Sequence, residues 1–454
     1  MSFARIAGAV LLFITVALPA AAQPAVPGDP PQRPPRAAPT TQIQVSTLPV
    51  MDTTPAFDAE VATKAYLAKV SGEARVKSNA YVQGGHLLRL VDLVYVLIIA
   101  SLLLWLQIST RIRDWAEERT RSRSYQVMLY AAVTVPLVTI ASLPLVFYES
   151  YLREHAYGLS NQSLVAWLGD FGIQFLLTLA ASLVLLPLLY GVIRRARESW
   201  WLWGAGLAIL CQVAVVMIYP VFIAPLFNHY APLPAGPLKT QILSLARANH
   251  VPAGNVWIMD ASRQSSRISA NVSGLMGTAR IALTDNLLKQ SPDEVLAVMG
   301  HEMGHYVMGH AVRQLLLMGL VTIAGFAFVS WAFRAACDIF GGQWQVRRIG
   351  DVAGLPLLAA LSAIYFFLAT PVTSSIARTA EAQADIFGLN AVRKPDAFAN
   401  VILKLSAYRK LEPGSLEETI FFDHPSGRTR IQTALRWKKE HIADSDIRGS
   451  AKLP

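Results

Sequence analysis

Long apolar runs separated by short polar loops dominate the hydrophobic pattern of the chain. An α-helix needs roughly 20 apolar residues to cross the hydrocarbon core of a bilayer. Only the first run contains an acidic residue, Asp92. The pattern therefore predicts a mainly α-helical, polytopic membrane bundle. Its six predicted spans cover residues 87–109, 127–148, 172–193, 200–222, 314–333 and 353–373.

The first 22 residues form a shorter apolar segment, with Arg5 near its start and an alanine-rich end. This arrangement is typical of a secretory signal peptide cleaved after Ala22, whereas an uncleaved segment would be a seventh span. Residues 23–56 are rich in Pro, Thr and Ala and show no periodicity. We expect an extended or disordered linker there.

Charge gives the predicted membrane helices an orientation. The formal net charge is +10, but the arginines collect in short loops beside the apolar runs, so we do not expect nucleic-acid binding. Because positively charged loops usually stay in the cytoplasm, the arginine-rich face is predicted to be cytoplasmic. Residues 149–171, 223–312 and 374–454 would then face away from the cytoplasm. The loop arginines are Arg111, Arg113, Arg119, Arg121, Arg123, Arg194, Arg195, Arg197, Arg334, Arg347 and Arg348.

Between the fourth and fifth runs the pattern changes to that of a small soluble unit. Residues 236–251 have the periodicity of an amphipathic helix, and residues 255–262 and 279–288 are typical of short strands. This segment predicts a small α+β unit. Cys211 and Cys337 lie in or beside apolar runs and indicate neither a disulfide framework nor a cysteine-rich metal site.

The stretch "SPDEVLAVMGHEMGH" predicts a helix that carries metal ligands. Ser291 is a typical N-cap, and Glu294 at the third helical position completes a capping box. His301 and His305 are four residues apart, so both imidazoles can reach one ion. Glu302 lies beside them, as in the H-E-x-x-H arrangement of zinc peptidases.

A third ligand must come from elsewhere in the chain. The extended motif with a third histidine is excluded, because Met308 and Ala311 occupy its glycine and histidine positions. Farther along, Arg378, Glu381 and Asp385 share one helical face. We expect Glu381 to bind the metal, Asp385 to orient a ligand histidine and Arg378 to be a charge partner.

The helix of the H-E-x-x-H motif is expected to continue into the fifth apolar run as one rod, which would bring the ligands to one face of the membrane. On such a continuous helix His310 would lie about 140° around from His305. We therefore do not count His310 as a metal ligand.

These motifs resemble the type I CAAX prenyl proteases, which are membrane-embedded gluzincin metallopeptidases related to the yeast a-factor converting enzyme. The resemblance extends over about residues 57–440 and suggests a bacterial member. Several blocks in the same order are more specific than H-E-x-x-H alone. The matching blocks are "HEMGH", "RTAEAQAD", "REHAYGLSNQS" (153–163), "PLFNHYAPLPAGPLKTQI" (225–242), "RIALTDNLL" (280–288) and "DHPSGRTRI" (423–431).

The resemblance implies one Zn²⁺ per chain, bound by His301, His305 and Glu381, with Glu302 as the general base. It further implies two residues that act on the substrate. His424 would contact the peptide and stabilise the oxyanion, with Arg430 assisting.

The family also has an edge strand that pairs with the peptide backbone by strand addition. In this chain the strand falls around residues 268–274. Ser269, Ala270 and Asn271 stand where the family has an Asn-Ala-Tyr/Phe core.

The implied activity is that of an integral-membrane zinc metalloendopeptidase acting on membrane-associated or misfolded polypeptides. One alternative is CAAX-type processing of prenylated peptides, and another is a non-catalytic membrane protein with structural zinc. A structural site is usually closed by four protein ligands, whereas three ligands beside a glutamate leave one position open. We expect a bacterial inner-membrane location, with the catalytic side facing away from the cytoplasm.

The expected domain plan has a membrane domain with four spans at residues 57–222. A metallopeptidase domain that includes the last two spans follows at 223–440, and a tail occupies 441–454.

Overall fold

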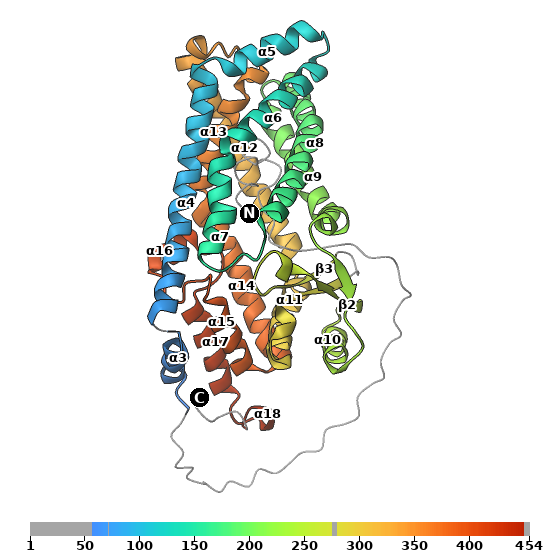
Figure 1. Cartoon of the computed structure of the whole chain (residues 1–454), viewed down its shortest axis with the longest axis vertical. Coiled ribbons are helices and arrows are strands. Elements are labelled where there is room, and N and C mark those ends of the chain that lie inside the picture. Colours follow the sequence, from blue (N-terminus) through green and yellow to red (C-terminus); the bar gives the residue numbers. More distant parts are fainter. Residues whose placement is uncertain (1–56, 71, 275–278, 449–454) are drawn as a thin grey trace.

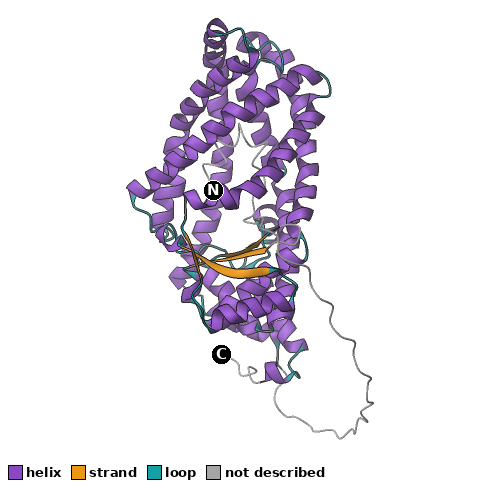
Figure 2. Cartoon of the chain, turned by 90° about the vertical axis from the view of Figure 1, so that its right-hand side faces the viewer, coloured by secondary structure: helices purple, strands orange, loops and turns teal. Residues whose placement is uncertain are grey.

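The computed structural model describes residues 57–70, 72–274 and 279–448 (Figure 1). The predicted signal peptide at 1–22 and linker at 23–56 lie outside the described residues, as does the end of the predicted tail. A bundle of long helices stands above a smaller unit that contains the sheet (Figures 1 and 2). The chain thus combines a membrane-type bundle with a compact α+β unit.

The predicted helical membrane bundle is confirmed. Within the described residues, five helices are long and apolar enough to cross a membrane, and a pair bent by 52° makes a sixth span if counted as one. The pair is η6 with α13 (Val352–Gly354, Leu355–Leu368) followed by α14 (Thr370–Val392). The five long elements are α4 (Gly72–Trp105); α6, η1 and α7 (Arg123–Phe147, Tyr148–Leu152, Arg153–Ala156); α8 (Leu164–Ala196); α9, η2 and η3 (Trp200–Ile218, Tyr219–Ile223, Ala224–Leu226); and α12 (His310–Trp344).

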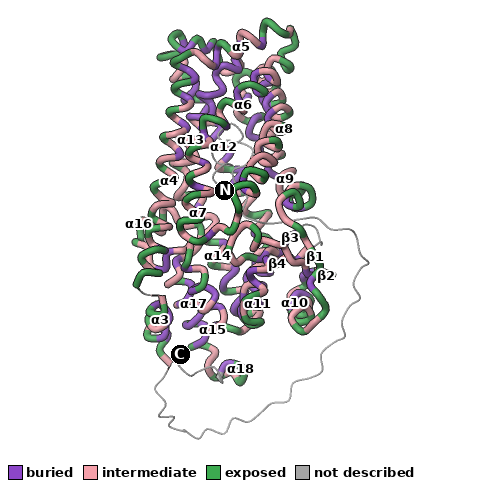
Figure 3. The backbone as a smooth tube through the Cα atoms, viewed as in Figure 1, coloured by how far each residue is buried: buried purple, intermediate pink, exposed green. Residues whose placement is uncertain are grey.

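The bundle is apolar on both its inner and outer faces. Aromatic side chains such as Tyr130, Tyr190 and Phe326 are fully buried between the helices. Large apolar residues such as Leu210 and Trp331 project outward, and exposed positions follow the outer faces of the helices (Figure 3). A helix that is hydrophobic all round is suited to lipid on one side and to helix packing on the other.

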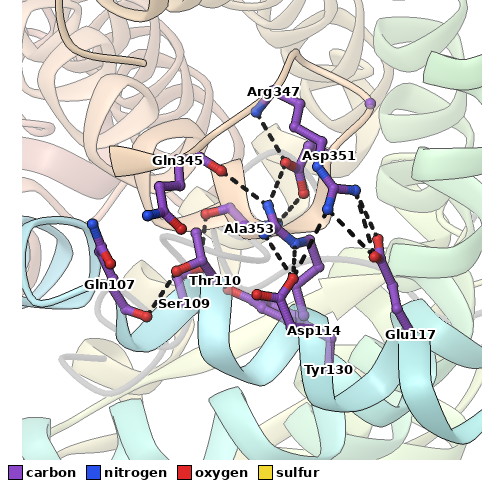
Figure 4. Close-up of polar contacts among 12 residues, drawn as sticks. Gln107, Ser109, Thr110, Asp114, Glu117, Tyr130, Gln345, Arg347, Asp351 and Ala353 are labelled. Carbon is purple, nitrogen blue, oxygen red and sulfur yellow. Dashed lines mark hydrogen bonds and ion pairs between the residues drawn. The ribbon is translucent and has the colours of Figure 1, made fainter. Parts of the chain in front are cut away.

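A short helix, α5 (Ile108–Arg119), lies across the end of the bundle far from the sheet (Figure 1). The Arg113 guanidinium donates to the Asp351 carboxylate at 2.8 Å and to the Gln345 carbonyl at 3.0 Å. Arg347 pairs with Glu117 at 3.1 Å, and the surrounding contacts appear in Figure 4. Removing one partner of a buried ion pair costs about 3–5 kcal/mol, so this network locks α5 onto the α12–α13 connection.

The unit at the other end of the bundle contains one four-stranded sheet in the order β1-β2-β4-β3. β2 and β4 are parallel, while β1 and β3 pair antiparallel with their neighbours. Side chains from one sheet face pack against α10 and α11, forming a core that includes Ile242, Ile281 and Met299. The strands are β1 (Tyr230–Pro232), β2 (Ala253–Met259), β3 (Ala270–Ser273) and β4 (Ala279–Thr284); the helices are α3 (Ala59–Ala68), α10 (Pro237–Ala248), η4 (Ala261–Arg263), η5 (Leu287–Lys289), α11 (Pro292–Val307), α15 (Pro395–Leu405), α16 (Ser415–Phe421), α17 (Gly427–Glu440) and α18 (Ser445–Arg448).

The expected single rod through the H-E-x-x-H motif and the fifth apolar run is wrong. The motif helix α11 ends at Val307, and α12 begins at His310. Gly309 between them has φ +64°, the left-handed conformation that commonly ends a helix and that glycine adopts without a steric penalty. The angular position expected for His310 on a continuous helix therefore does not apply.

Candidate active site

Helices α11 and α14 bring the three predicted metal ligands together. His301 Nε2 lies 3.1 Å from His305 Nε2 and 3.2 Å from Glu381 Oε2. His305 Nε2 lies 3.4 Å from the other carboxylate oxygen, Oε1. The two imidazoles and the carboxylate therefore present donor atoms to one shared point.

These separations fit a zinc ion. Zinc–nitrogen and zinc–oxygen bonds of 2.0–2.2 Å in a tetrahedron place neighbouring ligand atoms about 3.3 Å apart. The buried Glu381 Oε2 also makes no properly directed hydrogen bond within the described part of the chain. A buried oxygen without such a partner is costly, and a cation would satisfy it.

Small residues allow α11 and α14 to approach so closely. A Cβ added at Gly388 would lie 2.8 Å from the His301 backbone nitrogen, and one added at Gly304 would lie 3.1 Å from Ala384 Cα. At Gly388 only a hydrogen atom fits between the two backbones without a shift, and a methyl group at Gly304 would already be in tight contact. This close contact between the two helices, the α11–α14 seam, thus sets the distance between the histidines and Glu381.

Asp385, which we expected to orient a ligand histidine, lies behind His301. Its Oδ1 is 2.8 Å from His301 Nδ1, so His301 donates from Nδ1 and leaves Nε2 available for a metal. Burial alone would lower the pKa of His301, but the adjacent Asp385 and Glu381 carboxylates raise it to about 10. The surroundings therefore favour a positive charge at this point, which a metal ion would supply.

The charge partner of Asp385 is Arg430, whereas the sequence led us to expect Arg378 as a charge partner within the site. Arg430 donates to both carboxylate oxygens, at 2.8 and 2.6 Å. Arg378 instead donates to the carbonyls of Glu418 and Phe422, at 2.8 and 2.7 Å, where α16 ends. Arg378 therefore holds the segment that leads to His424.

His424 reaches the site from the loop after α16. Its Nε2 lies 3.1 Å from Glu381 Oε2, and its Nδ1 lies 2.8 Å from Asp423 Oδ1. Burial and the nearby Arg409 lower the pKa of His424. Burial also raises the pKa of Glu302, against the opposing effect of the two motif histidines. His424 is thus placed to touch a group bound beside Glu381.

The predicted substrate strand is an edge strand. β3 follows β4 at one end of the sheet order and pairs with it through Ala270 and Asn271. Ala270 is buried in the core, and Asn271 points to the opposite face, as successive strand residues do. Ser269 lies just before β3 and receives a hydrogen bond on its carbonyl from the Thr284 hydroxyl at 2.8 Å. Within the described residues, the outer side of β3 pairs with no other strand.

His310 is a neighbour of the site that we did not predict from the sequence. Its Nδ1 lies 3.0 Å from His305 Nδ1, and its side chain is buried. The turn at Gly309 produces this contact, because it redirects the chain after Val307. A glycine directly before this histidine was the available signal in the sequence.

A helical membrane bundle that carries a His-His-Glu cluster defines a polytopic membrane protein of the metallopeptidase class. Residues 232–438 match peptidase family M48, and residues 59–229 match the CAAX prenyl protease N-terminal region, described as five membrane helices. The chain belongs to the M48 family, in its CAAX prenyl protease group. It is an integral-membrane zinc metalloprotease, which sets aside the non-catalytic alternative.

Individual relatives agree with this assignment. The chain is 30% identical to the uncharacterized metalloprotease YhfN of Bacillus subtilis, over 72% of this chain and 77% of that one. It is 27% identical to CAAX prenyl protease 1 of Saccharomyces cerevisiae, over 69% and 73%. The crystal structure of S. mikatae Ste24p has the same fold, with a TM-score of 0.67, 23% identity and coverage of 83% and 95%.

Proposed function

We propose that the chain is an endopeptidase with one Zn²⁺ held by His301, His305 and Glu381. The observation that carries this proposal is the set of three ligand separations, 3.1, 3.2 and 3.4 Å, around a poorly satisfied buried carboxylate oxygen. The bound ion would supply a Lewis acid that polarises the scissile carbonyl and acidifies a water.

The residues of the chain then move the protons. Glu302 accepts a proton from the attacking water and returns it to the leaving nitrogen. His424 donates from Nε2 to the carbonyl oxygen as negative charge develops there, and Asp423 lies beside its Nδ1. Arg430 acts through Asp385 on the orientation of His301, because its two donating nitrogens are engaged by that carboxylate.

We propose that the substrate is an extended segment of a membrane-associated or misfolded polypeptide, which adds to the free edge of β3. CAAX-type processing is the second candidate, favoured by the 27% identity to a yeast protein of that name. A panel of extended peptides with and without a prenylated C-terminal cysteine separates the two. Cleavage restricted to the prenylated peptides would favour CAAX-type processing.

The test of the chemistry is Glu302→Gln, compared with Asp293→Asn on the exposed face of the same helix. We expect Glu302→Gln to keep its zinc and to lose about 10²–10⁴-fold in kcat on a membrane-bound reporter. Asp293→Asn should keep both zinc and activity. Full turnover by Glu302→Gln would refute the assigned base.

We further propose a bacterial inner-membrane location with the catalytic unit on the outer side. The support is that the arginine-rich loops and α5 lie at the end of the bundle away from the sheet (Figure 1). In a chain with Cys211 and Cys337 replaced by serine, Leu416→Cys places a thiol on the exposed part of α16. A membrane-impermeant maleimide should label it in intact spheroplasts. Labelling only after lysis would reverse the orientation.

A further inference from the structure

The second candidate metal ligand, His305, is backed by another imidazole, that of His310. His305 turns Nε2 toward Glu381 and His301, and its Nδ1 lies 3.0 Å from His310 Nδ1. His310 Nε2 lies 3.2 Å from Gln383 Oε1, which also accepts from Arg313 Nη1 at 2.8 Å. Four side chains from α11, α12 and α14 thus form one continuous row.

With His305 binding a metal through Nε2 and His310 neutral, the donor and acceptor roles along this row are fixed. An arginine can only donate, so the atom of Gln383 that faces it must be the carbonyl oxygen. His310 then donates from Nε2 to the same oxygen and, as a neutral ring, accepts at Nδ1. His305 is therefore the donor in the contact between the two rings, with its proton on Nδ1. Its Nε2 keeps a free lone pair on the side where the ligands converge.

We propose that His310 is a positioning residue that holds His305 in its metal-binding tautomer and ring orientation, and that Gln383 and Arg313 hold His310 in turn. The inference rests on the proposed function, because it takes His305 as a metal ligand. His301 is oriented by the Asp385 carboxylate, whereas His305 is oriented by a neutral imidazole. The two ligands are thus fixed by groups of different charge, and the second depends on a hydrogen bond rather than on an ion pair.

The break in the helix is what makes this contact possible. The positive φ of Gly309 lets α12 begin with its first residue, His310, buried against α11. The next turn of α12 brings Arg313 to Gln383 on α14. The row therefore couples the start of a membrane helix to the geometry of the metal ligands.

The test compares the zinc affinity of purified full-length variants by chelator competition. His310→Leu removes the acceptor, and we expect zinc affinity to fall about 10- to 100-fold, the usual loss when a group behind a metal ligand is removed. His310→Asn offers a carbonyl oxygen near the position of Nδ1, and we expect it to restore zinc affinity to within about threefold of wild type. A purely structural role would not distinguish an isosteric acceptor from an apolar side chain in this way.

Gln383 gives an independent comparison if His310→Leu does not fold. Gln383→Glu keeps the acceptor oxygen and should retain zinc affinity, whereas Gln383→Leu should weaken it several-fold. Wild-type zinc affinity in His310→Leu or, if that variant does not fold, in Gln383→Leu would overturn the inference. Equal losses in His310→Leu and His310→Asn would also overturn it.

Glu381→Gln separates this inference from the proposed function. If Glu381→Gln loses zinc and His310→Leu does not, the metal site stands and only the role of His310 fails. If Glu381→Gln binds zinc as tightly as wild type, the proposed metal site itself fails, and the inference about His310 falls with it.

Discussion

Gly388→Ala tests whether the close approach of α11 and α14 sets the metal geometry. The added Cβ would lie 2.8 Å from His301 N and 3.1 Å from His301 Cα, where ordinary contacts begin at 3.4 Å. Both neighbours are backbone atoms, so the helices must separate by about 0.6 Å locally, whereas metal–ligand distances tolerate only about 0.2 Å. Overpacking of this kind costs about 1–3 kcal/mol, offset in part by up to about 1 kcal/mol of better helix propensity.

The expected result is a modest loss of stability and a large loss of zinc affinity. Thermal unfolding of the metal-free protein measures the first effect, and chelator competition measures the second. Gly206→Ala in α9 is the matched control, because an added Cβ there meets no atom within 4 Å. It should leave zinc affinity unchanged. If Gly388→Ala binds zinc as tightly as the control, the seam does not set the ligand distances.

Three further variants probe the start of α11, the segment before β3 and the end of α16. Burial would raise the pKa of Glu294, but hydrogen bonds from Lys404 and the N-cap outweigh it and lower the pKa. Ionised Glu294 therefore stabilises the folded protein above the ordinary glutamate pKa, and this stabilisation is lost as pH falls through the lowered value. Glu294→Gln should therefore cost about 1–3 kcal/mol at pH 7, and its melting curve should converge with that of wild type in acid. Arg267 donates to Glu154 at 2.6 Å and anchors the segment before β3, the strand proposed to bind the peptide. Arg267→Met should therefore raise KM about tenfold, which corresponds to the free energy of one charge-assisted hydrogen bond. An unchanged KM would argue against this anchor. Arg378→Met should lower kcat because it frees the end of α16, and a loss of zinc affinity in this variant would contradict that explanation.

The sequence predicted the parts of the molecule that depend on local pattern. Run length and hydropathy predicted the membrane helices, and the capping residue Ser291 predicted the start of α11, where its side chain accepts from the Glu294 amide. Spacing on two helices selected His301, His305 and Glu381, which the structure brings together. Their roles as ligands stay predictions.

The contacts that the sequence missed depend on tertiary packing. Arg378 shares a helical face with Glu381, but α16 packs beside it and offers two carbonyls at its C-terminal end. Arg430 comes from α17, and nothing in its local sequence shows that this helix packs behind Asp385. His310 was missed because one glycine conformation ends the helix that was expected to continue.

X-ray absorption at the zinc edge on the purified full-length protein tests directly whether His301, His305 and Glu381 bind zinc. We expect one zinc per chain, with two histidine nitrogens and carboxylate oxygen at about 2.0–2.2 Å, a water oxygen completing the shell, and no sulfur. The signal from Glu302→Gln should keep the histidine shell, whereas that from Glu381→Gln should lose stoichiometric zinc. A protein that binds no stoichiometric zinc, or whose zinc keeps the same shell in Glu381→Gln, would refute this ligand set.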